Sequence, residues 1–116
     1  MPIKRDAFYA MLGIAMRAGA LSLGEGGVSK AISSGAALTV LLDAGASENT
    51  KKKFRDSCTF YKVPLFETEQ DRLGYAIGKP GRMSAAVARG TLGEKLLLMA
   101  REEVDGENAD QGRSRQ

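Results

Sequence analysis

The most constraining feature of this sequence is a short apolar run, Leu38-Thr39-Val40-Leu41-Leu42, which ends in Asp43. A continuous apolar run of this kind predicts a strand that is buried on both faces. Helix-like segments and short β-rich runs alternate on either side of it, and this alternation is typical of a sheet covered by helices. The sequence therefore predicts an α/β layered domain with helices on both faces of a small sheet.

The boundaries of the other elements follow from apolar spacing, caps and glycine stops. Ser47 is a good N-cap for a helix that should bury Cys58 and Tyr61 on one side. Pro64 should stand at the beginning of its strand, or where no ladder hydrogen bond is needed, because it has no N–H group. The expected helices are residues 6–18, 28–34, 48–61, 69–77 and 91–103, and the expected strands are residues 20–23, 38–42, 63–66 and 83–88.

The length of 116 residues indicates one domain with one adequate core. We expect residues 1–103 to form this domain and residues 104–116 to form a flexible acidic and polar tail. No apolar run approaches the roughly 18 residues that cross a bilayer, and the N-terminus lacks the apolar stretch of a signal peptide. A single cysteine suits a reducing compartment, so we expect a cytoplasmic protein with no membrane partner.

The chain contains no histidine, which removes the usual general base and the commonest metal ligand. Histidine-based triads and zinc sites are therefore excluded. Cys58 follows Phe54 by one helical turn on the expected buried face, and no histidine can activate it, so we interpret it as a core residue. A small phosphate-binding enzyme remains an alternative, but it would need Glu25, Asp43 or Glu48 as its general base.

The basic and acidic residues are unevenly distributed along the chain. The whole chain has 17 Lys and Arg against 14 Asp and Glu, a formal net charge of +3. Residues 1–100 hold 14 of the basic and only 9 of the acidic side chains, whereas residues 101–116 are acidic overall. The expected domain is thus more basic than the total suggests, which fits a nucleic-acid partner and equally fits an ordinary globular protein.

The segment Gly24-Glu25-Gly26-Gly27 is the most unusual local feature. It follows a short strand and opens a helix, so its amide groups and the helix dipole can receive a phosphate. It matches neither the Walker pattern nor the dinucleotide-binding fingerprint. The alternative interpretation is a tight strand-to-helix turn without a ligand, because glycine is the default residue in such turns.

Two further basic segments are candidates for contact with phosphate groups. Lys51-Lys52-Lys53 is the densest cluster, but successive helical residues turn by about 100°, so the three cannot face one partner. Pairing with Asp56 on a solvated helix face is the simpler interpretation. The segment 78–83 combines two cations, two glycines, a proline and a methionine, and it is either a contact loop or an ordinary helix-to-strand connection.

Five segments, taken in order, resemble a known family of ribosomal proteins. Leu12-Gly13-Ile14-Ala15-Met16-Arg17-Ala18-Gly19-Ala20-Leu21 is similar to the opening of the kink-turn-binding superfamily of L-seven-Ae and L-thirty-e type, with bacterial L-seven-Ae-like members nearest in pattern. The other segments are residues 28–35 after Gly24, residues 38–43, residues 46–54 and residues 73–79. The resemblance covers about residues 5–100, and it is the ordered set that makes it specific.

The resemblance implies a three-layer α/β/α sandwich with a four-stranded mixed sheet, no enzymatic activity and no cofactor. It also implies that RNA is bound by the helix start at residues 24–30 and by the loop at residues 79–83. Strong kink-turn binders have the sequence Gly-x-Asn-Glu-x-x-Lys at the helix start that corresponds to residues 24–30. Gly24 and Lys30 match this pattern, but Gly26 and Gly27 replace the side chains that reach base edges. The remaining contacts would be directed to phosphates, with altered selectivity.

The sequence thus predicts a monomer that binds structured RNA, kink-turn-like or ribosomal, without a metal or a small-molecule substrate. The alternative is a protein-interaction module on the same fold, with RNA binding weakened or lost. An aromatic stacking platform is not expected, since tryptophan is absent and the tyrosines and phenylalanines mostly fit the core. The candidate RNA-binding residues are Gly24, Glu25, Gly26, Gly27, Lys30, Arg17, Lys79, Pro80, Arg82 and Met83, with Lys51 and Lys52 as secondary candidates.

Overall fold

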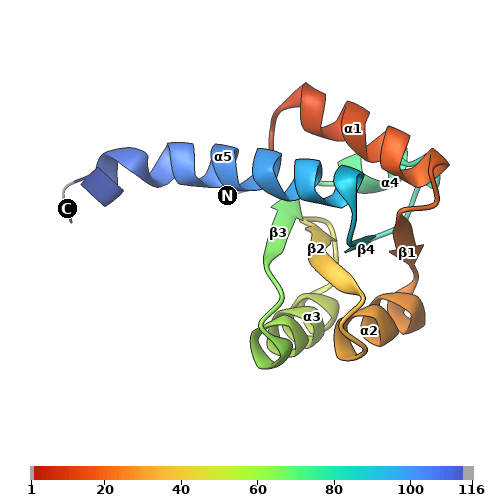
Figure 1. Cartoon of the computed structure of the whole chain (residues 1–116). Coiled ribbons are helices and arrows are strands. Elements are labelled where there is room, and N and C mark those ends of the chain that lie inside the picture. The colour runs from red at the N-terminus through yellow and green to blue at the C-terminus, as the bar shows by residue number, and fades with distance from the viewer. Residues whose placement is uncertain (1, 114–116) are drawn as a thin grey trace.

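The computed structural model describes the backbone of residues 2–113 and the side chains of residues 2–104. Five helices and four strands are assigned in this part of the chain, and they form an α/β fold as predicted (Figure 1). In chain order they are α1 (Asp6–Arg17), β1 (Leu21–Leu23), α2 (Glu25–Ser33), β2 (Ala37–Asp43), α3 (Glu48–Tyr61), β3 (Leu65–Thr68), α4 (Arg72–Ala76), β4 (Ser84–Ala88) and α5 (Thr91–Arg113).

The four strands form one mixed sheet in the order β1-β4-β2-β3. β4 is antiparallel to both of its neighbours, and β2 is parallel to β3. β1 lies at one edge of this sheet and β3 at the other. The register places Leu23 opposite Ala85, so the start of α2 lies beside the residues that lead into β4.

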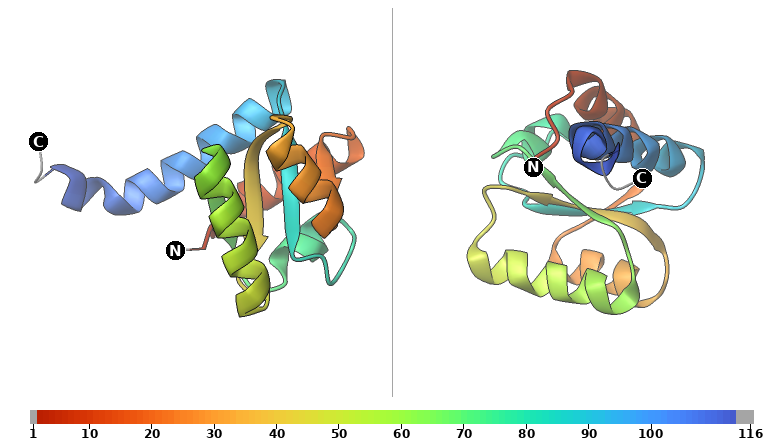
Figure 2. Two further views of the ribbon diagram at one scale, coloured as in Figure 1. Left: turned by 90° about the horizontal axis from the view of Figure 1, so that it is seen from below. Right: turned by 90° about the vertical axis from the view of Figure 1, so that its left-hand side faces the viewer.

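Helices cover both faces of this sheet, which gives three layers (Figure 2). α2 and α3 lie on one face, and α1, α4 and α5 lie on the other. Alternate residues of β2 supply the two cores: Val40 and Leu42 pack with α2 and α3, and Leu41 packs with the opposite layer. Every residue of β2 except Leu38 is buried, which confirms the predicted strand with two buried faces.

Several element boundaries differ from those predicted. α2 begins at Glu25, so the segment predicted as a turn supplies the first helical turn instead. β3 begins at Leu65, because Pro64 has no N–H group and offers only its carbonyl oxygen, which accepts from Val40 N–H at 2.9 Å. The strand continues to Thr68, two residues past its predicted end. α4 begins only at Arg72, because Asp71 has a positive φ of 66°.

The two ends of α3 show what local pattern can and cannot predict. The Ser47 side chain accepts from the backbone N–H of Thr50 at 3.2 Å, which confirms the N-cap. Cys58 is 3 % exposed, as expected for a core residue. Tyr61, predicted to be buried, is 47 % exposed. It occupies the last position of α3 and lines an open hollow rather than the core.

The final helix, α5, runs to Arg113 and so passes the predicted end near residue 103. A flexible tail over residues 104–116 stays a prediction, and residues 114–116 lie outside the described residues. In the part of the chain that the structure describes, no helix is both long enough and apolar enough to cross a membrane.

Candidate nucleic-acid interface

The start of α2 presents backbone N–H groups without intrahelical partners. Gly24 is the N-cap residue, and its φ of 79° is a conformation that glycine adopts readily. The first hydrogen bond of the helix runs from Val28 N–H to the Gly24 carbonyl oxygen at 2.9 Å. The N–H groups of the preceding helical residues therefore have no acceptor within the helix. Gly26 and Gly27 are exposed, and a Cβ at either would meet no atom within 4 Å.

The loop between α4 and β4 is held tightly against the backbone of α4. Lys79 N–H donates to the Gly74 carbonyl oxygen at 2.8 Å, and Arg82 N–H donates to the Lys79 carbonyl oxygen at 3.2 Å. A Cβ on Gly74 would lie only 2.8 Å from the Lys79 oxygen and 2.9 Å from the Gly81 nitrogen. Glycine at this position is therefore what allows the loop to fold back onto the helix.

A buried carboxylate fixes the beginning of α4 and thereby the position of this loop. Asp43, at the end of β2, is fully buried. One of its carboxylate oxygens accepts from the N–H groups of Gly45 and Asp71, both at 2.8 Å. The other accepts from the Thr68 hydroxyl at 3.0 Å and from Leu73 N–H at 3.1 Å. This network ties β2, β3 and α4 together at one end of the sheet.

The α2 start and the loop meet around Arg82. A Cβ built on Gly24 would lie 3.5 Å from one guanidinium nitrogen of Arg82. The two segments enclose a hollow of about 220 Å³, which also reaches α3 through Thr50. Its lining residues are Gly24, Glu25, Thr50, Gly81, Arg82, Met83 and Ser84. Four sequence-predicted residues are thus brought together at one place.

The lysine run of α3 is electrostatically balanced, in contrast to the loop. Asp56 raises the pKa of Lys52 through a hydrogen bond and its charge. The three lysines have one acidic partner each, in the pairs Lys51–Glu48 at 3.8 Å, Lys52–Asp56 at 2.8 Å and Lys53–Glu25 at 3.0 Å. Among the described residues, no ion pair involves Lys30, Lys79 or Arg82.

Glu25 ties the start of α2 to α3. One of its carboxylate oxygens is 3.0 Å from the Lys53 ammonium, and the other accepts from the Thr50 hydroxyl at 3.4 Å. Its negative charge is therefore neutralised on the α3 side. What Glu25 offers to an anion is its backbone N–H at the helix start, not its side chain.

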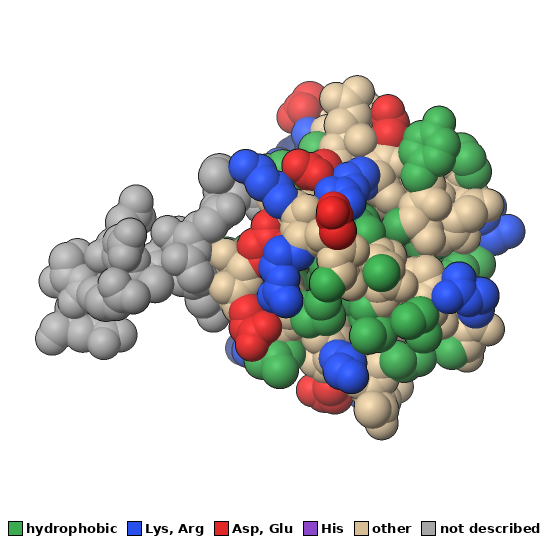
Figure 3. Space-filling model, turned by 90° about the horizontal axis from the view of Figure 1, so that it is seen from above, with side chains coloured by type: hydrophobic (Ala, Val, Ile, Leu, Met, Phe, Trp, Pro, Cys, Tyr) green, Lys and Arg blue, Asp and Glu red, His purple; other side chains and the backbone are tan. Residues whose placement is uncertain are grey.

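The remaining candidate residues lie at different distances from this hollow. Lys30 follows Gly27 by one turn on α2, and both line a neighbouring hollow of about 270 Å³. Lys79 and Pro80 are exposed in the loop. Arg17 lies apart, at the junction of α1 and α4: a Cβ on Gly13 would be 3.5 Å from its guanidinium nitrogen. That face of the molecule, with α1 and α5, intersperses acidic, basic and apolar side chains (Figure 3).

Sequence reasoning missed residues that reach the site from other elements. Thr50 and Ser84 line the hollow, and nothing in their local sequence distinguishes them from other polar residues near element ends. The tyrosines and phenylalanines mostly lie in or against the core, as expected, but three of them are exposed. Phe60 is 77 % exposed, and Tyr75, which precedes the loop on α4, is 72 % exposed; Tyr61 is the third.

Two features that chemistry at this interface could use, a reactive thiol and a metal cluster, are not found in the described residues. Burial raises the pKa of Cys58 to about 11, so its thiol is protonated at neutral pH. Within residues 2–104, no three or more Cys, Asp or Glu side chains come together as a metal site would require. Exposed amides, unpaired cations and an open hollow are features suited to binding an anion.

Residues 6–98, which include all four strands, match the family described as the ribosomal protein L7Ae/L30e/S12e/Gadd45 family. The chain belongs to this family. Its fold also agrees with a solved protein of unknown function from Bacillus halodurans, with a TM-score of 0.78 and 34 % sequence identity. That match covers 84 % of this chain and all of the other. The family predicted by resemblance is therefore confirmed.

Other relatives have names that state a ligand. The chain is 41 % identical over 93 residues to the RNA-binding protein YlxQ of Bacillus subtilis, covering 79 % of this chain and 93 % of that protein. It is 40 % identical over 87 residues to the RNA-binding protein YlxQ of Enterococcus faecium, covering 74 % and 84 % respectively. A 15.5 kD RNA-binding protein of Giardia lamblia shares the fold at a TM-score of 0.71, covering 91 % of this chain and 94 % of that one, at 16 % identity.

Proposed function

We propose that this chain is a non-catalytic RNA-binding protein that recognises structured RNA, kink-turn-like or ribosomal. The observation that supports this most directly is the meeting of two features at Arg82. The open helix start at Gly24 and the basic loop adjoin there, and both belong to the segments expected to bind RNA. The relatives named as RNA-binding proteins, at about 40 % identity, support the same ligand class.

The proposed mechanism relies on phosphate recognition at a bend of the RNA backbone. The N-terminus of α2 carries a partial positive charge of about half a unit, together with N–H groups that point outward. Arg82 stands beside this point, Lys30 adds charge one turn further along α2, and Lys79 adds charge in the loop. Pro80 and Met83 supply apolar surface against which a splayed base or a ribose packs.

The proposed selectivity follows from the two glycines in the first turn of α2. Gly26 and Gly27 have no side chains to reach base edges, so the binding free energy comes from phosphates and RNA shape rather than from base identity. The protein should therefore tolerate changes in the paired bases at the bend better than changes that straighten the backbone.

The proposal is tested by titrating a fluorescent kink-turn RNA with the wild-type protein and its variants across a salt series. Lys30→Ala, Lys79→Gln and Arg82→Gln should each weaken binding and lower the slope of log affinity against log salt by about one. Lys95→Gln removes one charge from α5 and serves as the matched control. If the three variants bind as tightly as the wild type, the assigned surface is wrong. Wild-type protein that shows no salt-dependent RNA binding would favour the protein-interaction module.

A further inference from the structure

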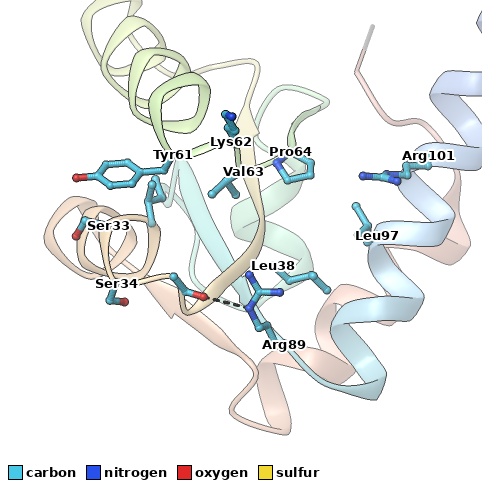
Figure 4. A pocket seen from close by; sticks show the side chains of 12 residues that line it. Ser33, Ser34, Leu38, Tyr61, Lys62, Val63, Pro64, Arg89, Leu97 and Arg101 are labelled. Atoms are coloured by element: carbon cyan, nitrogen blue, oxygen red, sulfur yellow. Dashed lines mark hydrogen bonds between the residues drawn. The ribbon is translucent and has the colours of Figure 1, made fainter.

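A second and larger hollow lies at the opposite ends of α2 and α3 (Figure 4). Its volume is about 480 Å³. The smaller hollow touches the beginnings of these two helices, at Gly24 and Thr50. The larger one touches their ends, at Ser34 and Tyr61, and is bordered on the far side by Leu97 and Arg101 of α5. α2 has nine residues and is about 13 Å long, which sets the approximate separation of its two ends.

Three cations from separate parts of the chain line this hollow (Figure 4). Lys62 follows α3, Arg89 follows β4, and Arg101 lies on α5. The residues that line the hollow include no aspartate or glutamate. The two helix C-termini each contribute about half a negative charge, so three full positive charges outweigh them.

One of the three cations holds the backbone in place, and the other two are exposed to solvent. The Arg89 Nε–H donates to the Gly35 carbonyl oxygen at 3.1 Å, beyond the end of α2. Lys62 and Arg101 are exposed and take part in no ion pair of the described residues. Their charges face solvent, where a phosphate would find them.

An exposed aromatic pair lies at the end of α3, where the Tyr61 ring points to the side away from Arg89 and Arg101 (Figure 4). The rings of Phe60 and Tyr61 meet edge to face at a centroid distance of 4.8 Å, and both are exposed to solvent. Tyr61 lines the hollow itself. Cations for the backbone next to aromatic faces for the bases are the combination that holds single-stranded nucleic acid. A purely acidic peptide would use the cations alone, whereas a nucleic acid would also stack a base on Tyr61, the ring that lines the hollow.

We propose that this hollow is a second RNA-binding site, which holds a single-stranded segment that continues from the RNA bound at the start of α2. This inference rests on the proposed function for its ligand class, but it concerns a different surface. Phosphates of the segment pair with Lys62 and Arg101, and a base stacks on Tyr61. The protein then binds a structured element and its unpaired flank together.

The test compares a kink-turn RNA with the same RNA carrying a single-stranded extension, by fluorescence anisotropy. The extension should strengthen wild-type binding by about fivefold or more. The double variant Lys62→Gln with Arg101→Gln should lose this gain and lower the salt slope on the extended RNA by about two. Its affinity for the unextended RNA should stay unchanged. Lys4→Gln with Lys95→Gln removes the same charge elsewhere and should keep the gain.

Three results would overturn the second RNA-binding site, and each can be distinguished from a result that overturns the proposed function. The inference is wrong if the extension adds no affinity to the wild type, or if the double variant keeps the gain. It is also wrong if a glutamate-rich peptide binds the wild type more tightly than a free single-stranded oligonucleotide and needs the same two cations, because the hollow then belongs to an acidic protein. If the wild-type protein does not bind the kink-turn RNA without the extension, the proposed function is contradicted instead.

Discussion

Replacing Gly74 with alanine should move the loop that carries Lys79 and Arg82. The new Cβ would stand 2.8 Å from the Lys79 carbonyl oxygen, 2.9 Å from the Gly81 nitrogen and 3.1 Å from the Pro80 Cα. Ordinary contacts of this kind begin at 3.4 Å, and all three atoms are backbone, so no side-chain rotation relieves the overlap. The loop must shift by roughly half an ångström or more, and the hydrogen bond from Lys79 N–H to Gly74 is strained with it.

The energetic effect has two opposed parts. Overpacking of a fixed backbone contact costs about 1–3 kcal/mol, and alanine is a better helix former than glycine by up to about 1 kcal/mol. The free energy of unfolding should therefore fall by about 1–2 kcal/mol. RNA affinity should fall severalfold as well, because the displaced loop no longer presents Arg82 beside Gly24.

Urea denaturation and RNA titration of Gly74→Ala test both parts. Gly26→Ala is the matched control for stability, since its Cβ meets no atom within 4 Å. That control should be as stable as the wild type or more stable, by up to about 1 kcal/mol. The reasoning is refuted if Gly74→Ala is as stable as Gly26→Ala and binds RNA as tightly as the wild type.

Two further predictions concern buried groups. Asp43→Ala leaves the Thr68 hydroxyl and three N–H groups without their acceptor, so the free energy of unfolding should fall by about 3 kcal/mol or more in urea; an unchanged midpoint would contradict this. For Cys58, the folded pKa of about 11 lies above the unfolded value of 9.0, so its contribution is complete below pH 9 and is lost as the pH rises towards 11. Cys58→Ala should show a smaller loss of stability over that range, and a thiolate-selective reagent should label the native thiol only slowly at pH 8.

The sheet and its two helical layers could be predicted because they depend on local periodicity. The run from Leu38 to Leu42 required cover on both faces, and the structure supplies it. The start of α4 could not be predicted, because Asp43 fixes the backbone of Asp71 across 28 residues of chain. The end of α5 could not be predicted for a different reason. The sequence beyond Val104 is polar and has no apolar stripe that would indicate a longer helix.

Glycine-rich segments of the candidate site could be singled out in the sequence, but the ion pairs between elements could not. Residue types made Gly24 and the loop near Gly81 candidates, the family resemblance assigned RNA to them, and their spatial meeting follows from the pairing of β1 with β4. The ion pair between Lys53 and Glu25 joins α3 to α2, and nothing in the sequence around either residue indicates it. The same is true of the exposed Tyr61, whose helical phase pointed to the core.

The two glycines in the first turn of α2 also have a consequence for local dynamics. Each weakens helix formation by about 1 kcal/mol relative to alanine, so this turn should open more often than the rest of the helix. Glu25, held to α3 by Lys53 and Thr50, and the buried Val28 anchor the two ends of this turn, and the two glycines lie between them. The Val28 amide, which donates to the Gly24 carbonyl oxygen, should therefore exchange faster than later amides of α2, and the turn can adjust its N–H directions to phosphates of different spacing.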